Sequence, residues 1–473
     1  MSKKKVLIIV SAVLGIFVLA IGGFFVYNTY LAGKSPAPTS SQEKTEALKL
    51  DPQKEATHLS KVAGTPGAYW MRGLPFIWND IEREKGKFDW TITDSNLNKS
   101  KTPKGESEER YHLAMIWPYA NWDQDTCHKD SKYLATGHLK ESSEDLKMGA
   151  PCAMQAYASF LEKLVERYDG DGKDDMPGLK IPIKYWEIMN EPEMQGGSTG
   201  GAGEDLKFFV GTPKEYLEIL KTSYETIKKA DPQAKVAHAG MAGMQQNFQD
   251  FWDPIFKAGG GNYFDIANIH TISTDTRRED LYVIKFKKYL EKYGIANKPI
   301  WVTEVQFGSL QDEPKDLPAF EKLLARSSVF ALAKGTDKLF YIENWLFWGN
   351  MPGPGEKDKK EDGKMTQEME KALQGSTHKV YLNLVNKINS FEKVEVLAEK
   401  FVEGPGDPDG ATSQIGQYKF INGSKVVYVL WGQATLPSEI SGKVKVTDIY
   451  GEGEEVDAGS IILSDEPIFL ELL

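Results

Sequence analysis

Cysteine and histidine are both scarce in this chain. Its 473 residues include 2 cysteines and 7 histidines, and no two histidines have the helical spacing of a metal-ligand pair. Cys127 and Cys152 have only His128 nearby, which makes a poor ligand set for zinc. These shortages argue against a metal-dependent hydrolase and against a structural zinc site.

Concentrated positive charge is also lacking. The formal net charge is -11 at pH 7, and the 57 lysines and arginines are scattered along the chain rather than gathered into a stripe. Because nucleic-acid-binding proteins present a basic patch or stripe, we expect no nucleic-acid partner. The length and a hydrophobic content of 41% allow one large buried core and a smaller second one.

The amino terminus differs from the rest. Three lysines at positions 3–5 precede an uncharged run from Val6 to Tyr27, which is long enough to cross a bilayer as a helix. The run exceeds the apolar core of a signal peptide and lacks a small-x-small cleavage site, so residues 1–28 are predicted to be a single-pass membrane anchor. The positive flank places the rest of the chain outside the cell, after a polar linker over residues 29–55. A cleaved signal peptide, and therefore secretion, is the alternative.

If the chain lies outside the cell, the oxidation state of its two cysteines can be predicted. Thiols outside the cell are usually oxidised, and 24 residues separate Cys127 from Cys152. We therefore predict a disulfide rather than two free thiols. Such a bridge would stabilise the fold by roughly 3 kcal/mol.

A run from Ile183 to Met189 stands at the centre of the pattern. Apolar and aromatic residues dominate it, as in a strand buried on both faces, and it ends in Asn190-Glu191-Pro192 before a glycine-rich loop. A carboxylate thus stands where a buried strand opens to solvent. In a parallel barrel that end carries the active site.

Glu304 is a second carboxylate at the end of an apolar, β-branched run. It lies 113 positions after Glu191 (304 minus 191), which is close to three strand-plus-helix units of roughly 30 to 40 residues each. If Glu191 ends the fourth strand of a barrel, Glu304 ends the seventh, and the two acids can flank one bond. Ordinary ion-pair roles at two strand ends are the alternative.

Strand and helix patterns alternate through residues 56–390, which predicts an α/β fold, a (β/α)8 TIM barrel. An opening strand is hard to find between Ala47 and Gly67. From 391 to 473, short alternating runs between turn residues predict a small antiparallel β-sandwich. The pattern predicts helices over Met154–Tyr168, Pro213–Ala230, Leu281–Tyr293 and Leu317–Ala333, and strands over Ala68–Leu74, His112–Trp117, Lys235–Ala239, Phe264–His270 and Lys338–Trp345.

An acidic segment follows the first of these helices. Asp169, Asp171 and Asp175 alternate with glycines, and such oxygen ligands suit a hard cation such as calcium. The spacing does not match the twelve-residue calcium loop, and an acidic turn without an ion is the alternative. No other cofactor is expected, and the sequence carries no signal for an oligomeric state.

Several motifs together resemble a known group. Trp78-Asn79-Asp80-Ile81-Glu82, Gly86-Lys87-Phe88-Asp89-Trp90, Asn190-Glu191-Pro192, Thr303-Glu304 and Trp345 are similar to motifs of the retaining glycoside hydrolases of clan A. Within the clan the chain most resembles families 39 and 5, the cellulase and xylosidase relatives, over about Tyr69 to Ser390. The resemblance implies an enzyme that hydrolyses β-linked glycans with retention of configuration.

The resemblance also implies roles for single residues. Glu191 would be the general acid/base and Glu304 the nucleophile. Asn190 would hold the sugar 2-hydroxyl, and Trp345 would lie under the sugar at the cleavage point. Retention requires the carboxyl groups to lie about 5 to 5.5 Å apart, with Glu191 protonated through a raised pKa and Glu304 ionised.

Other residues complete the expected site. Arg72 and His270 fall where clan A enzymes orient the nucleophile or the glycone, although the tyrosine that often follows such a histidine is replaced by Ile272. Trp78 and Trp117 stand at strand ends, where aromatic faces suit the C–H faces of sugars.

Two interpretations stay open beside these. We read Glu187, inside its strand, as structural, and Glu343 as the buried partner of Arg72. The competing hypothesis for the whole chain is a surface carbohydrate-binding protein on a barrel that has lost its chemistry.

Overall fold

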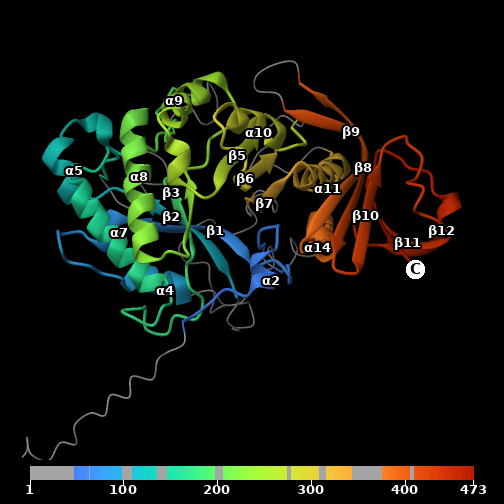
Figure 1. Cartoon of the computed structure of the whole chain (residues 1–473), viewed down its shortest axis with the longest axis horizontal. Coiled ribbons are helices and arrows are strands. Elements are labelled where there is room, and N and C mark those ends of the chain that lie inside the picture. The colour runs from blue at the N-terminus through green and yellow to red at the C-terminus, as the bar shows by residue number, and fades with distance from the viewer. Residues whose placement is uncertain are drawn as a thin grey trace, which may run out of the picture. The chain divides into compact units, whose positions relative to one another are not determined.

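The computed structural model in Figure 1 describes residues 47–62, 64–98, 109–135, 146–197, 206–273, 278–307, 316–342, 375–404 and 410–473. Strands and helices alternate through its first three quarters. The elements are α2 (Pro52–Glu55), β1 (Trp70–Ile77), α3 (Trp78–Ile81), α4 (Thr91–Asn98), β2 (Tyr111–Trp117), α5 (Asn121–Cys127), α7 (Met154–Tyr168), β3 (Tyr185–Ile188), α8 (Pro213–Ala230), β4 (Lys235–His238), α9 (Gln246–Lys257), β5 (Ala267–Ser273), α10 (Val283–Lys292), β6 (Ile300–Phe307), α11 (Leu317–Ala333), β7 (Thr336–Tyr341) and α14 (Ser376–Ile388).

The predictions for the longest helices are confirmed. Helices α7, α8 and α11 have the predicted bounds. In α8, Thr212 caps the helix by accepting from the backbone N–H of Glu215, whose side chain reaches back to the N–H of Thr212, and Pro213 occupies the first turn. Such end signals, together with one apolar face, make a helix readable from sequence.

The strands form a closed parallel barrel. β1 to β4 pair in sequence order, and so do β5 to β7. Parallel bridges between Ala237 and Ile266 and between Met241 and Ile269 join the two sets. With a short segment at Leu59 and Ser60 that completes the circle, the seven named strands make an eight-stranded TIM barrel.

The opening strand, which is hard to find in the sequence, is the segment at Leu59 and Ser60. Leu59 pairs with Leu339 of β7, and Ser60 pairs with Trp70 of β1. Two residues are too few to show an alternating pattern. The segment is held instead by Asn389, whose Oδ1 accepts from the backbone N–H groups of His58 (3.0 Å) and Leu59 (2.5 Å).

The predicted linker at 29–55 extends too far. Its last residues lie against the barrel: Glu55 accepts from the Tyr185 hydroxyl at 2.5 Å, and its carbonyl accepts from Trp70 Nε1 at 3.0 Å and from Lys338 Nζ at 2.7 Å. No helix among the described residues is long and apolar enough to cross a bilayer. The predicted anchor from Val6 to Tyr27 lies outside those residues.

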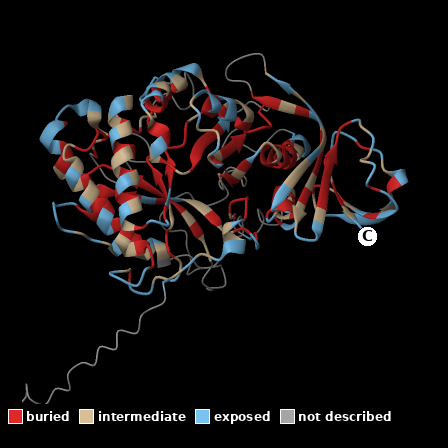
Figure 2. Ribbon diagram, viewed as in Figure 1, coloured by how far each residue is buried: buried red, intermediate tan, exposed pale blue. Residues whose placement is uncertain are grey.

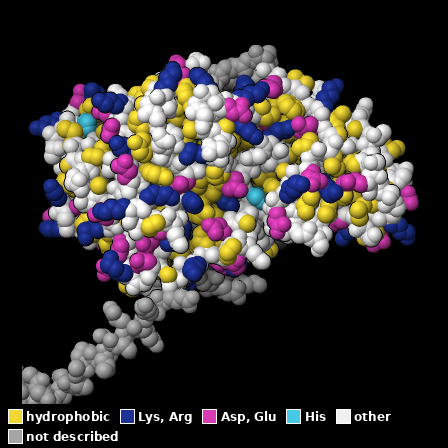
Figure 3. Space-filling view, viewed as in Figure 1, with side chains coloured by type: hydrophobic (Ala, Val, Ile, Leu, Met, Phe, Trp, Pro, Cys, Tyr) yellow, Lys and Arg dark blue, Asp and Glu magenta, His cyan; other side chains and the backbone are white. Residues whose placement is uncertain are grey.

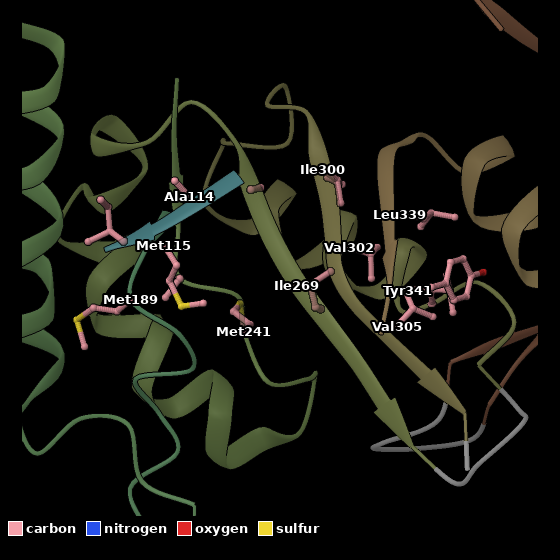
Figure 4. Close-up of a cluster of buried hydrophobic side chains, with 14 of the residues drawn as sticks. Ala114, Met115, Met189, Met241, Ile269, Ile300, Val302, Val305, Leu339 and Tyr341 are labelled. Atoms are coloured by element: carbon pink, nitrogen blue, oxygen red, sulfur yellow. The ribbon is translucent and has the colours of Figure 1, made fainter. Parts of the chain in front are cut away.

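Apolar side chains fill the barrel. Met115 of β2, Ile269 of β5, Val302 of β6 and Leu339 of β7 belong to one buried cluster (Figure 4). The barrel strands are largely buried along their length, and helices α7 and α8 bury one face, whereas α11 is buried on nearly all sides (Figure 2). Because the interior is occupied, polar chemistry is confined to the ends of the strands and their loops.

The carboxyl-terminal part forms one sheet rather than the two layers of the predicted sandwich. Val427 and Val429 of β10 belong to the barrel's cluster, whereas Tyr428 and Leu430 join a separate one. Helices α11 and α14 lie beside the sheet and supply its second layer (Figure 1). The described strands are β8 (Lys393–Glu403), β9 (Ala411–Asn422), β10 (Lys425–Trp431), β11 (Lys443–Thr447), β12 (Gly453–Asp457) and β13 (Ile468–Leu472). Neighbouring strands are antiparallel, and their order across the sheet is β12-β11-β13-β10-β9-β8.

The predicted disulfide is confirmed. Cys127 and Cys152 are bonded, with their Cα atoms 5.9 Å apart. The bond ties the end of α5 to the segment before α7. Both cysteines are therefore consumed by the bridge, which leaves no thiolate for a metal at this place.

Closure of the barrel should depend on the Asn389 amide. Replacing Asn389 with Ala removes the acceptor of the buried Leu59 N–H and the donor to the carbonyl of Gly67, whereas the His58 N–H keeps the backbone carbonyl of residue 389; each unsatisfied group costs about 1 to 3 kcal/mol. We expect the midpoint of urea unfolding to fall markedly. Asn386, exposed on the same helix, provides the control, and N386A should unfold like the wild type. Equal midpoints for N389A and N386A would contradict this account of closure.

Candidate active site

The loop after β3 carries Asn190 and Glu191 at one end of the barrel. Met189 and Glu191 have φ angles of 70° and 39°, in the left-handed region that residues other than glycine seldom adopt. Such strain persists only where surrounding contacts fix it, and it is frequent at functional sites. Here the N–H of Met189 donates to the carbonyl of Ile116 at 3.0 Å, which fixes the turn against the neighbouring strand.

Arg72 joins three strands beneath this loop. Its Nε donates to Glu187 Oε2 at 2.6 Å, and its Nη2 donates to Glu187 Oε1 at 3.0 Å and to Asn190 Oδ1 at 2.6 Å. Its Nη1 donates to Glu304. Burial works against the charge, but Glu187 and Glu304 outweigh burial and raise the pKa of Arg72 above its usual value. Among the described residues, Glu187 and Glu304 are the carboxylate partners of Arg72; Glu343, the predicted partner, lies outside these residues and stays a prediction.

Glu191 and Glu304 meet at His270. A carboxylate oxygen of each glutamate and a ring nitrogen of His270 all lie within 4.8 Å of one another. His270 Nδ1 is 2.6 Å from Glu191 Oε1 and 3.8 Å from Glu304 Oε2. The side chain of Glu191 is 7% exposed and that of Glu304 is 20% exposed. The two acids thus lie close together in different surroundings.

These surroundings shift the pKa values of the acid and the histidine. Burial raises the pKa of Glu191, and the charge of Glu304 adds to the shift, while His270 opposes it. Burial alone would lower the pKa of His270, but Glu304 and Glu191 outweigh it, so the pKa of His270 is raised. Both groups therefore hold protons to higher pH than they would in water.

A bulge in β6 brings an additional residue into the site. Ile269 of β5 is paired with Val302, but the next residue, His270, is paired with Glu304, so Thr303 is the extra residue. Thr303 Oγ1 then lies 3.0 Å from His270 Nε2 and 2.7 Å from Asn268 Oδ1. The sequence indicated Thr303 only as the residue before the candidate nucleophile, and it did not indicate Asn268 as a site residue. Strand alternation puts Asn268 on the same face as His270, but no sequence pattern predicts the bulge.

No protein-family model matches the chain, and no curated protein matches it in sequence. Its structure is similar to that of a family 39 glycoside hydrolase from the gut symbiont Bacteroides cellulosilyticus, with a TM-score of 0.54 and 16% identity over 90% of this chain and 83% of that one. A glucosidase from Croceicoccus marinus aligns with a TM-score of 0.51 and 12% identity over 91% of this chain and 98% of that one. The chain shares its fold with these glycoside hydrolases, in agreement with the resemblance to clan A. At these identities the likeness shows the fold alone.

The tryptophans expected in a clan A cleft differ in their placement. Trp78 is wholly buried between Tyr157, Phe160 and Trp122, and its Nε1 donates to Glu82 at 2.6 Å, so the prediction of a sugar-binding face is wrong. Its aromatic neighbours all come from elements distant in sequence. The other two expected residues are untested in that role: Trp117 is 5% exposed, and Trp345 lies outside the described residues.

Two carboxylate groupings merit comparison as metal sites. At Glu191 and Glu304, the guanidinium of Arg72 already supplies positive charge to Glu304. In the acidic turn, oxygens of Asp169, Asp171 and Asp175 lie within 4.8 Å of one another. Both carboxylate oxygens of Asp175 accept backbone N–H groups, and burial raises the pKa of Asp169 to about 7. The turn is thus satisfied by its own backbone, and calcium binding there stays a prediction of the sequence.

Removing the ion pairs of Arg72 should lower the stability of the fold. Arg72→Met leaves the wholly buried Glu187 without its cation, which typically costs about 3 to 5 kcal/mol. The double variant R72M/E187Q removes the orphaned charge and should regain part of that loss in urea unfolding. Lys229→Met breaks an exposed pair and should change the unfolding free energy by less than about 1 kcal/mol. A double variant less stable than R72M would contradict the interpretation.

Proposed function

We propose that this protein is a retaining glycosidase that hydrolyses β-linked O-glycosidic bonds of oligo- or polysaccharides outside the cell. In the first step the Glu304 carboxylate attacks the anomeric carbon, the glycosidic C–O bond breaks, and the proton of Glu191 goes to the leaving oxygen. In the second step Glu191 takes a proton from a water molecule. That water attacks the same carbon and releases Glu304.

One observation carries the proposal. Oxygens of Glu191 and Glu304 lie within 4.8 Å of each other at the end of the barrel where loops follow strands. Direct attack by a carboxylate suits a carboxyl separation of about 5 to 5.5 Å, whereas a water-mediated inverting reaction suits ~6.5 to 9.5 Å. The spacing therefore favours retention.

The surroundings divide the two roles. Glu191 is buried and has a raised pKa, as a proton donor near neutral pH requires. Glu304 accepts a hydrogen bond from Arg72, which favours its ionised form as a nucleophile. Asn190, held by Arg72, is the proposed partner of the sugar 2-hydroxyl, and Trp345 and Trp117 are the proposed aromatic contacts.

The proposed location is the outer face of a cell membrane. The apolar run from Val6 to Tyr27 would anchor the chain, with secretion as the alternative if the run is cleaved. The disulfide between Cys127 and Cys152 suits an oxidising compartment. Basic and acidic side chains are interspersed on the face in Figure 3, as expected of a protein whose substrate is a neutral carbohydrate.

The nucleophile can be trapped. Activated 2-fluoro glucosides and xylosides form glycosyl-enzymes that hydrolyse slowly, and mass spectrometry should find the label on the peptide that contains Glu304. Glu304→Gln should abolish both labelling and turnover of aryl glycosides. A label on another carboxylate would overturn the assignment. Binding of polysaccharides without any turnover, unchanged in E304Q, would favour the carbohydrate-binding alternative.

The acid/base should be visible in the pH profile. Because the pKa of Glu191 is raised, its proton is retained above the usual pH for a glutamate, and kcat/KM should fall only as pH rises past that raised value. In Glu191→Ala this alkaline limb should disappear. Glycosides with poor leaving groups should lose about 10²- to 10⁴-fold in kcat/KM, while dinitrophenyl glycosides lose little. Equal losses for both substrate types would exclude Glu191 as the acid.

A further inference from the structure

The hydrogen-bond partners of Asn268 allow only one orientation of its side-chain amide. Asn268 Nδ2 lies 2.8 Å from Glu187 Oε1 and 3.3 Å from the carbonyl of His238. Glu187 is bound by Arg72 and is a carboxylate, so both of these partners only accept. The amide nitrogen must therefore face them, which turns the Asn268 oxygen toward Thr303.

The orientation of Asn268 fixes the proton of Thr303. A threonine hydroxyl has a single hydrogen, and at 2.7 Å from Asn268 Oδ1 that hydrogen is donated to the amide oxygen. Toward His270 Nε2, 3.0 Å away, Thr303 Oγ1 can then only accept. His270 Nε2 accordingly carries a hydrogen in every protonation state of the ring.

His270 Nδ1 is the ring position left for proton exchange. It lies 2.6 Å from Glu191 Oε1. The ring packs closely against Gly240, where a Cβ would come within 1.9 Å of Nε2, and a ring flipped by a half-turn would direct carbon atoms at Glu191 and Thr303. Glu191 and His270 thus form a pair that titrates through one hydrogen bond.

Charged and titratable groups from β1, β3, β4 and β6 or their loops surround this pair. Glu193, in the same loop as Glu191, is one of them: burial raises its pKa to about 8, and its charge interacts with that of Glu191. Arg72 and Glu304 face the pair from β1 and β6, and Glu187 of β3 reaches it through Asn268. His238 of β4 accepts from the Asn268 N–H at 3.0 Å, and burial lowers the pKa of His238 to about 3, so it stays neutral. None of these groups can replace the acceptor that Thr303 provides to Nε2.

We propose that Thr303 is a positioning residue that holds His270 with its proton on Nε2 and so reserves Nδ1 for Glu191. The kinetic consequence of this positioning rests on the proposed function, whereas the tautomer of His270 does not depend on that function. Thr303 acts through His270 and touches no substrate in this scheme. The sequence shows it only as the residue before the candidate nucleophile, and its role follows from the bulge in β6.

Removing the hydroxyl should shift the pH profile toward acid. When the ring is charged, both nitrogens donate, and Thr303→Val leaves Nε2–H without an acceptor. The neutral ring escapes this loss by moving its proton to Nδ1, so the variant disfavours the protonated pair. A hydrogen bond to a charged donor is strong enough for the alkaline limb of kcat/KM to move down by about one pH unit. Thr303→Ser keeps the hydroxyl and should restore the limb.

The experiment combines kinetics with ¹⁵N NMR of the histidine rings in the full-length protein. In the wild type and in T303S, Nε2 of His270 should be protonated at every pH, with the His270 signals assigned by their loss in His270→Asn. In T303V the neutral ring should carry its proton on Nδ1. Thr271→Val is the matched control: Thr271 is equally buried beside His270, but its hydroxyl donates to the carbonyl of Leu281 at 3.0 Å.

The outcomes separate the two proposals. A wild-type His270 with an unprotonated Nε2, or a T303V variant with the wild-type tautomer, would overturn the inference. So would an alkaline limb unchanged in T303V, or one shifted equally in T271V. If the tautomers are as expected but no glycoside is turned over by the wild type, the positioning role stands and the proposed function fails.

Discussion

The candidate site depends on the ion pairs made by one buried guanidinium group, that of Arg72. Two carboxylates of the site, Glu187 and Glu304, lie in surroundings where an unpaired charge is expensive, and Arg72 serves both. His270 serves the third carboxylate, that of Glu191. Two of the three glutamates thus share a cationic partner, and the third shares a proton with His270. This division lets acids in close proximity hold different numbers of protons.

Two local irregularities aim the side chains at one another. The left-handed backbone at Met189 and Glu191 turns the chain that carries the proposed acid away from the line of β3. The bulge at Thr303 shifts the pairing of β6 with β5 by one residue. A regular strand alternates its side chains between two faces, so it could not present Thr303 and Glu304 to the same histidine. The site therefore depends on departures from regular geometry in a scaffold that is otherwise regular.

The sequence predicted what local physics determines. The long helices α7, α8 and α11 have their predicted bounds, because an apolar face marks α7 and α8, and a capping residue with a proline in the first turn marks the start of α8 and of α11. The pairing of Glu191 with Glu304 followed from the barrel repeat. The opening strand was missed because only Leu59 and Ser60 pair, and its acceptor, the Asn389 amide, lies far away in sequence.

Contacts between distant segments account for the errors. Trp78 stands at a strand end, as a sugar platform would, but Tyr157 and Phe160 of α7 cover it. Glu187 was predicted to be structural without a named partner, because in the sequence it looks like any polar residue inside an apolar run; its contact with Arg72 joins β3 to β1. The second layer of the carboxyl-terminal sheet is made by barrel helices rather than by further strands. None of these pairings is visible from neighbouring residues.

The position of Asn389 has a consequence for how the chain reaches its native state during synthesis. The amide that secures residues 58 and 59 is translated 330 positions later than Leu59. Until then the short opening segment has only its bridges to Leu339 and Trp70 to hold it, and if it detaches, the edges of β1 and β7 are left unpaired, the kind of surface that recruits other chains. During synthesis the opening strand therefore gains its side-chain acceptor only after α14 and its capping residue have been made.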